Sequence, residues 1–155
     1  MTNQGLFQET NLPLQGSNMF HLLYVSSAVK HFSKNELVEM LNKARENNLR
    51  LGVTGLLVYK DGNFMQVLEG DKPVVLDLYA TISADPRHHD GIIILEEEIE
   101  KPVFADWSMG FRDLSDPKIL ALPSFSRFMN NTLSYESVKD DPTGALELLN
   151  FFRLH

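Results

Sequence analysis

The sequence predicts an α+β fold in which a five-stranded mixed sheet carries two helices on one face. Three observations lead to this prediction. Short apolar runs alternate with two segments of helical periodicity, in the order β-α-β-β-α-β-β. The dipeptide Asp61-Gly62 joins two β-branched and aromatic runs, as in a two-residue hairpin. Both faces of that hairpin are apolar, so C-terminal helices are expected to cap the second face. This is the ferredoxin-like pattern with one added strand.

Composition narrows the class of protein. The chain has 155 residues, 43% of them hydrophobic, which suits one domain with a small extension. Its net charge of −7 argues against broad contacts with nucleic acid or anionic membranes. The absence of cysteine excludes disulfides, thiolate metal sites and cysteine nucleophiles. No apolar run approaches the ~20 residues that span a bilayer, and residues 1–18 do not resemble a signal peptide, so a cytoplasmic protein is expected.

The first strand and helix are predicted over residues 19–27 and from Lys34 onward. Ser33 and Glu36 have the spacing of a capping box, which starts a helix at the next residue. The stripe of this helix that faces the core ends on an amide rather than on an apolar side chain. Its members are Leu37, Leu41, Ala44 and Asn48.

The hairpin places a glutamine on an apolar face. With Asp61-Gly62 as its turn, Leu57 lies opposite Gln66, and side chains alternate between faces along each strand. The side chains that share one face are Gly55, Leu57, Tyr59, Phe64, Gln66 and Leu68. A buried amide without partners costs about 1–3 kcal/mol, so a polar group is expected against this face.

The remaining elements follow in order. Asp71 with Pro73 predicts the start of a second helix, which ends at Asp85-Pro86 and buries Val75, Leu78, Tyr79 and Ile82. Residues 92–95 are predicted as a buried strand, and the charged residues 96–101 lead to a last strand. That strand covers residues 107–111, with Trp107, Met109 and Phe111 on one face. Two further helices are predicted over 117–130 and 144–154.

Polar side chains from three of these elements converge on the helix-covered face. They are Tyr24, Asn48 and Gln66, and Arg87 and His88 follow the second helix. Taken singly, Tyr24 can be a core tyrosine, Asn48 the end of a helix and Arg87 a solvated charge. Together they indicate a planar ligand with polar edges, held between the two helices. Four histidines, His21, His31, His88 and His89, do not favour a metal site, because adjacent histidines rarely converge on one ion.

Several motifs carry a family resemblance from about Met19 to Phe111. They are LLYVSSA, the pair Asn47-Asn48, GVTGLLVYKDGNFMQVLEG, DPRHH and FADWSMGF. With these motifs in this order, the chain resembles the BLUF family of blue-light sensors that use flavin. The resemblance implies a flavin ring between the two helices, with FAD as the expected cofactor and FMN or riboflavin as alternatives.

The resemblance also implies roles for individual residues. Tyr24 matches the photochemical electron donor, Gln66 the switching amide, and Asn48 the amide that pairs with the pyrimidine edge of the flavin. The cofactor-binding residues that it implies are Tyr24, Asn47, Asn48, Gln66, Ile82, Asp85, Arg87 and His88. Trp107 and Met109 match the residues that pass the signal on.

The expected organisation is a flexible arm over 1–18, a flavin-binding domain over 19–113 and a helical extension over 114–155. It resembles the short, stand-alone class, which has no catalytic turnover and signals to a separate effector protein, without direct nucleic-acid or membrane contacts. A homo-oligomer is expected from the apolar residues Leu120, Leu122, Phe125, Phe128 and Met129. Two alternatives remain: a small flavin-dependent or hydrolytic enzyme on the same fold, and a protein-binding module without photochemistry.

Overall fold

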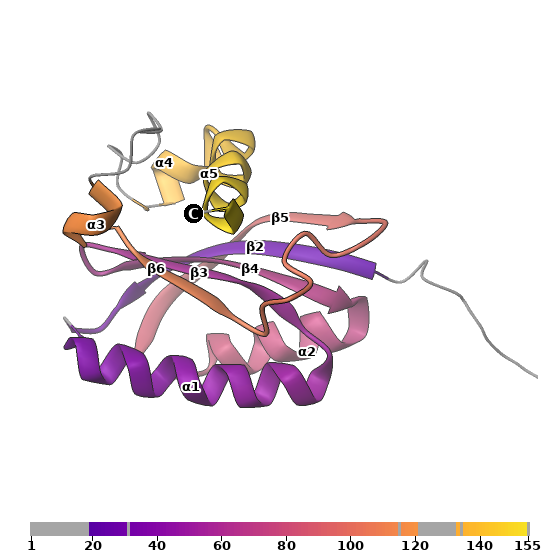
Figure 1. Ribbon diagram of the computed structural model, residues 1–155, viewed down its shortest axis with the longest axis horizontal. Coiled ribbons are helices and arrows are strands. Elements are labelled where there is room, and N and C mark those ends of the chain that lie inside the picture. The colour runs from indigo at the N-terminus through magenta and orange to yellow at the C-terminus, as the bar shows by residue number, and fades with distance from the viewer. Residues whose placement is uncertain (1–18, 31, 115, 121–132, 134, 155) are drawn as a thin grey trace, which may run out of the picture.

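The computed structural model describes residues 19–30, 32–114, 116–120, 133 and 135–154. One sheet separates two layers of helices (Figure 1). The elements are β2 (Met19–Ala28), α1 (Lys34–Leu51), β3 (Thr54–Lys60), β4 (Asn63–Asp71), α2 (Lys72–Ser83), β5 (His88–Glu98), β6 (Gly110–Asp113), α3 (Pro117–Leu120), α4 (Tyr135–Lys139) and α5 (Pro142–Leu154). The predicted arm over 1–18 lies outside the described residues, as do 121–132.

The sheet is mixed, and its order is β5-β2-β4-β3-β6. Strands β3 and β6 run parallel, whereas the other neighbouring strands are antiparallel. The predicted hairpin turn is confirmed, because Asp61 and Gly62 have φ angles of 49° and 82°. The register pairs Gln66 with Leu57 on one side and with Tyr24 on the other. Gln66 therefore lies at the centre of the sheet.

Local signals determine where α1 begins and ends. The capping box is confirmed: the Glu36 N–H donates to Ser33 Oγ at 3.1 Å, and the Ser33 N–H donates to Glu36 Oε1 at 3.0 Å. Gly52 ends the helix in the left-handed conformation, with φ 71°. Helix α2 starts after Asp71 with a proline in its first turn, but the Asp71 side chain makes no capping hydrogen bond.

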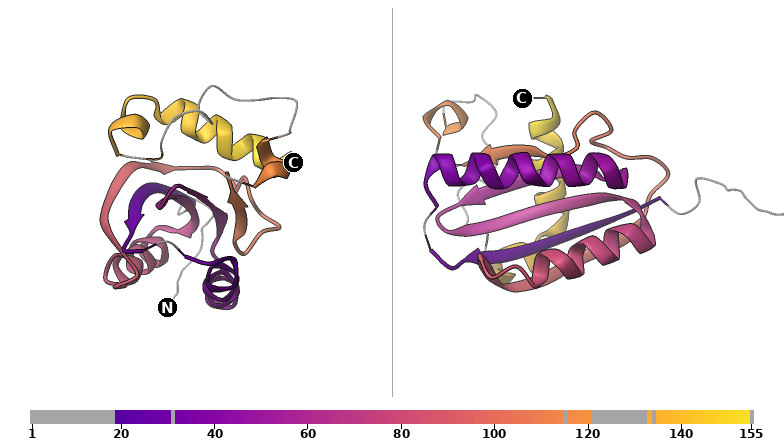
Figure 2. Two further views of the ribbon diagram at one scale, coloured as in Figure 1. Left: turned by 90° about the vertical axis from the view of Figure 1, so that its left-hand side faces the viewer. Right: turned by 90° about the horizontal axis from the view of Figure 1, so that it is seen from below.

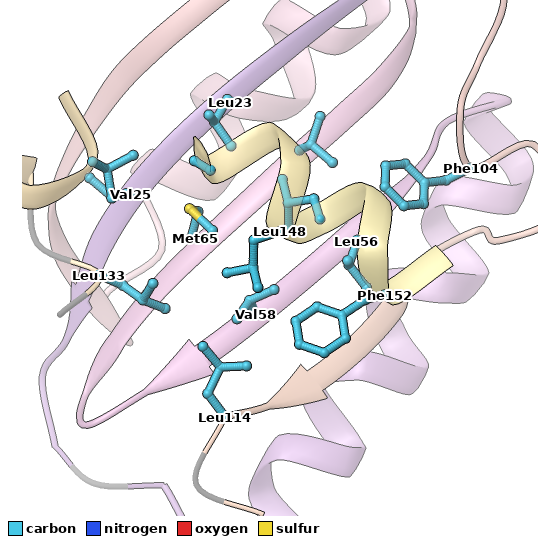
Figure 3. Close-up of a cluster of buried hydrophobic side chains, with 14 residues drawn as sticks. Leu23, Val25, Leu56, Val58, Met65, Phe104, Leu114, Leu133, Leu148 and Phe152 are labelled. Carbon is cyan, nitrogen blue, oxygen red and sulfur yellow. The ribbon is translucent and has the colours of Figure 1, made fainter. Parts of the chain in front are cut away.

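The two faces of the sheet belong to two separate cores. Helices α1 and α2 cover one face and α5 covers the other, as both views of Figure 2 show. The core under α1 and α2 contains Phe20, Leu22, Tyr24, Leu57, Phe64, Leu68 and Met109. The core under α5 contains Leu23, Val25, Leu56, Val58, Met65, Val67, Leu148, Leu149 and Phe152. Figure 3 shows Leu148 and Phe152 reaching from α5 toward the side chains of the sheet.

Three sequence predictions about the fold are wrong in part. The predicted buried strand over 92–95 is part of β5, an edge strand in which Ile92 is 37% exposed. An apolar run does not by itself say whether a strand has one neighbour or two. The C-terminal region contains α4, which was not predicted, and α5 begins at Pro142 rather than at Gly144. The predicted helix over 117–130 is described only over 117–120.

The last strand is the third correction. It covers Gly110–Asp113 rather than 107–111, so Trp107 and Met109 lie in the loop before it. Side chains alternate between faces only within a strand, and the argument that placed both residues on one face does not apply to a loop. Met109 joins the core under α1 and α2, whereas Trp107 packs against the core under α5.

Candidate functional site

A cavity of about 480 Å³ lies between α1, α2 and the sheet. Its size falls within the range of roughly 300–1,000 Å³ that is usual for ligand pockets. Of the predicted binding residues, those that line it are Tyr24, Asn47, Asn48, Gln66, Ile82, Asp85 and Arg87. The cavity is also lined by residues that are not among the predicted binding residues, and these include Met40, Leu41, Lys43, Arg50, Leu57, Phe64 and Leu78. The side chain of His88 lies outside the described part of the chain.

Tyr24 and Gln66 form a buried hydrogen bond next to this cavity. The two residues are cross-strand neighbours, and the Tyr24 hydroxyl donates to Gln66 Oε1 in a short contact. Burial raises the pKa of the Tyr24 hydroxyl, and the nearby Tyr79 and Asp85 raise it further. Tyr24 is therefore a neutral O–H donor at ordinary pH. Because its hydroxyl bonds to the Gln66 amide oxygen, the amide nitrogen of Gln66 points away from Tyr24.

The other end of Gln66 contacts a thioether. Its amide Nε2 donates to Met109 Sδ at 3.2 Å, and Met109 is 1% exposed. Sulfur in a thioether is a weak acceptor, so this N–H is held less firmly than the amide oxygen on the Tyr24 side. The Gln66 amide thus lies between a good donor, the Tyr24 hydroxyl, and a weak acceptor, Met109 Sδ. A stronger acceptor could take the place of Met109 Sδ as the partner of the Gln66 N–H.

Asn48 reaches the same region from α1. The helix continues to Leu51, so the interpretation of Asn48 as a helix end is wrong. Its side chain is 3% exposed, and Nδ2 donates to the Ser108 carbonyl at 2.9 Å. Asn47, one residue earlier, is less buried, and its amide oxygen accepts a bond from Arg50. The two asparagines therefore occupy different surroundings along the cavity wall.

Asp85 and Arg87 place a charge pair at the rim of the cavity. Arg87 Nε donates to Asp85 Oδ1 at 2.9 Å, and the Arg87 backbone N–H donates to the same oxygen at 2.9 Å. The hydrogen bonds to Asp85 raise the pKa of Arg87, so the guanidinium stays cationic. A fixed cation beside a cavity stabilises negative charge that develops on a bound group.

Ser26 lines the cavity, and its Oγ is buried without a hydrogen-bond partner among the described residues. Ser26 is not among the predicted site residues. It follows Tyr24 by two residues in β2 and therefore lies on the same face of the sheet, and this spacing was the available signal. Buried polar atoms are usually satisfied, so this hydroxyl fits a ligand with polar edges. Flavin has carbonyl acceptors and an N–H donor at one edge, and the amides, the hydroxyl and the apolar walls of this cavity fit it.

Trp107 does not line the cavity. Its ring packs on the α5 side of the sheet at 5.8 Å from the Phe104 ring, and it lies against Gly110. A Cβ at Gly110 would lie 2.4 Å from Trp107 Cε3, so only glycine permits this packing. The two predicted output residues are therefore separated: Met109 touches the site, and Trp107 faces the opposite core.

The described part of the chain contains no cluster of three or more histidine, cysteine, aspartate or glutamate side chains suited to a metal ion. His21 instead lies with Nε2 at 2.8 Å from Glu97 Oε1. Among the same residues, none of the helices is long and apolar enough to cross a membrane.

Residues 19–110 match the model of the BLUF family, described as sensors of blue-light using FAD. The photoactivated adenylate cyclase subunit beta of Euglena longa is 34% identical over 94 residues, which are 60% of this chain and 11% of that protein. The blue light- and temperature-regulated antirepressor BluF of Escherichia coli K12 is 35% identical over 60 residues, 39% of this chain and 15% of that protein. The chain spans about a tenth of the length of the cyclase relatives.

Solved structures agree with the sequence matches. The dark state of BlrB, a BLUF protein, superposes with a TM-score of 0.74 and 28% identity, over 90% of this chain and 98% of that one. A bacterial light-regulated adenylyl cyclase superposes with a TM-score of 0.60 and 27% identity, over 84% of this chain and 33% of that one. The chain therefore belongs to the BLUF family of flavin-binding blue-light sensors, and the matched part is a photoreceptor domain, not an enzyme.

Proposed function

We propose that blue light switches this photoreceptor through the hydrogen bonds of Gln66. The observation that carries the proposal is the buried chain from the Tyr24 hydroxyl through the Gln66 amide to Met109 Sδ. A bound flavin would supply the absorption of blue light and an acceptor for one electron. Because burial raises the pKa of Tyr24, its hydroxyl would lose its electron and its proton together, and the proton would pass to Gln66 Oε1. Gln66 would stay neutral by giving up an amide N–H proton toward the reduced acceptor.

The side-chain amide of Gln66 can adopt two hydrogen-bond arrangements. In the arrangement described above, its oxygen accepts from Tyr24 and its nitrogen donates to Met109. A change in the orientation or tautomer of the amide exchanges donor and acceptor, which breaks the contact with Met109. The local change thereby alters the packing of the loop that precedes β6.

We propose that Asn48 anchors the pyrimidine edge of the flavin and that Arg87 balances negative charge on the ring, with Asn47, Ile82, Asp85 and His88 completing the binding site. FAD is the proposed form, because the family description names it. Lys43, Arg50 and Arg87 line the cavity and suit the phosphates of a nucleotide. The alternative of an enzyme on the same fold has no support in the family match.

For signal output, we propose that a separate effector protein reads the state of the domain. The names of the relatives associate light with an adenylate cyclase and with an antirepressor. The division into 19–113 and 114–155 is part of this proposal, with the qualification that α5 helps to form the second core. A homo-oligomer and a cytoplasmic location stay predictions. The residues on which the oligomer prediction rested lie outside those whose side chains are described.

The test is the absorption spectrum of the purified, flavin-loaded protein in the dark and under blue light. Wild type is expected to show a reversible red shift, and Tyr24→Phe and Gln66→Leu to bind flavin without that shift. Tyr59→Phe is the matched control, because Tyr59 is a buried tyrosine of the same core that does not line the cavity. A normal shift in Gln66→Leu would contradict the proposed switch, and a colourless wild type would favour a binding module without photochemistry.

A further inference from the structure

Arg112 in β6 lies between the loop that precedes β6 and the last turns of α5. Its guanidinium carbon is 5.3 Å from the centre of the Trp107 ring and 5.8 Å from that of the Phe152 ring. Arg112 Nη2 donates to the Phe152 carbonyl at 3.3 Å, and Nη1 donates to the Phe111 carbonyl at 2.8 Å. One side chain therefore contacts the strand, the loop and the helix.

The chemistry of these contacts suits a link between elements. The Phe152 carbonyl belongs to the end of α5, where helical carbonyls have no partner within the helix and a cation is favourable. The ion pairs of the described residues do not include Arg112, so aromatic faces and carbonyls are the contacts that hold it. Partial burial lowers the pKa of Arg112, but a guanidinium remains charged in proteins. A partly buried guanidinium within 6 Å of the centres of two aromatic rings makes favourable cation–π contacts with both.

The loop on the other side of Arg112 is in contact with the proposed switch. Met109 receives the Gln66 amide N–H, and Asn48 donates to the Ser108 carbonyl. Arg45 from α1 donates from Nε to the Met109 carbonyl at 2.7 Å. The backbone of residues 107–109 is thus held from the cavity side, while the Trp107 ring is held from the α5 side.

We propose that Arg112 is the positioning residue that makes the docking of α5 depend on the position of Trp107. This inference rests on the switch proposed at Gln66. When Gln66 releases Met109, the loop shifts, and the Trp107 ring no longer covers one face of the guanidinium. Arg112 then caps the Phe152 carbonyl less firmly, and the end of α5 opens more often. The surface that an effector reads is the end of α5 and the part of the sheet beneath it.

The experiment is hydrogen exchange of α5 in the full flavin-loaded chain, measured in the dark and under continuous blue light. Arg112→Met keeps the length of the side chain and removes its charge and its donors, whereas Arg112→Lys keeps the charge and removes the planar fork. Arg153→Met is the matched control, because Arg153 is an exposed arginine of α5 that bonds to Asn150. The fluorescence of Trp107, the only tryptophan of the chain, reports whether its ring has moved.

In wild type and Arg153→Met, light is expected to speed the exchange of α5. In Arg112→Met, exchange in the dark should already be about tenfold faster, and light should add little to it. Arg112→Lys should lie between the two, and all three variants should keep the red shift of the flavin. A fluorescence change on illumination that persists in Arg112→Met would place Arg112 after Trp107 in the sequence of events and support the proposal.

Two results would overturn the proposal. One is a rate of hydrogen exchange in α5 that is the same in both Arg112 variants as in wild type. The other is faster exchange in the dark with an undiminished ratio between light and dark, which would make Arg112 a purely structural contact. If Arg112→Met does not fold, the ratio in Arg112→Lys decides in the same way. Loss of the red shift in wild type would instead contradict the proposed switch, so the two failures are distinguishable.

Discussion

The two faces of the sheet are built from the same strands, yet they differ in how their polar groups are satisfied. Under α5, the buried His21 and Glu69 have protein partners. The Glu69 carboxylate accepts from the Val103 and Phe104 N–H groups at 2.7 and 3.0 Å and from Thr54 Oγ1 at 2.8 Å. Under α1 and α2, Ser26 Oγ has no partner among the described residues and the Gln66 N–H has only a thioether.

This difference separates what holds the fold together from what binds the ligand. A face whose polar groups are all satisfied by protein contributes packing and stability. A face that leaves donors and acceptors beside a cavity gains from a ligand that supplies the missing bonds. Because neighbouring residues of a strand point to opposite faces, a register shift of one residue would exchange the two roles.

The largest expected effect comes from the apolar core under α5. Leu148 is 1% exposed and packs between α5 and the sheet, so Leu148→Ala should lower the free energy of unfolding by about 2–5 kcal/mol. Urea unfolding followed by circular dichroism measures this loss. Leu49→Ala is the control, because Leu49 is 76% exposed. A loss as small as that of the control would mean that α5 is not docked on the sheet.

The buried carboxylate of the second face gives the next effect. Glu69→Gln keeps the shape but replaces one carboxylate oxygen with an NH2 donor, which then faces a backbone N–H group, and this should destabilise the protein by about 1–3 kcal/mol. The unfolding midpoint in urea is the measurement, and Glu98→Gln, at an exposed position of β5, is the control. Equal midpoints for the two variants would show that the loop before β6 does not depend on Glu69.

On the cavity face, the main effect is on binding rather than on folding. Asn48→Ala should weaken flavin binding by about 1–3 kcal/mol, because the proposed anchor of the pyrimidine edge is removed. Fluorescence quenching of added flavin gives the dissociation constant. Asn35→Ala, at an exposed position in the first turn of α1, is the control. An unchanged dissociation constant in Asn48→Ala would remove Asn48 from the binding site.

The smallest effect, and the sharpest contrast with Glu69, is expected at Ser26. Ser26→Ala removes a buried hydroxyl that has no hydrogen-bond partner among the described residues, so the flavin-free protein should keep its stability or gain up to about 1 kcal/mol. The same change should weaken flavin binding, because a ligand contact is lost. Ser27→Ala is the control, since Ser27 Oγ donates to Asn63 Oδ1 at 3.1 Å. A flavin-free Ser26→Ala that is less stable than wild type would contradict the comparison between the faces.

The sequence by itself determined those features that depend on neighbours in the chain. The capping box at Ser33, the turn at Asp61-Gly62 and the alternation along β3 and β4 all follow from local geometry. Register then followed from the turn, and it placed Gln66 beside Leu57 as predicted. The family motifs lie mostly on these same strands and helices and on the turns next to them. This is why most of the predicted binding residues line the cavity.

Only the tertiary structure decided the features that depend on segments distant in the chain. It made β5 an edge strand and turned Trp107 and Met109 to opposite faces. It also left the Ser26 hydroxyl without a hydrogen-bond partner in the described part of the chain. It also brought Arg112 between Trp107 and α5. Periodicity reports on which side of its own strand a residue lies. It does not report what lies opposite, because loop paths and helix docking are chosen by the packing of the whole molecule.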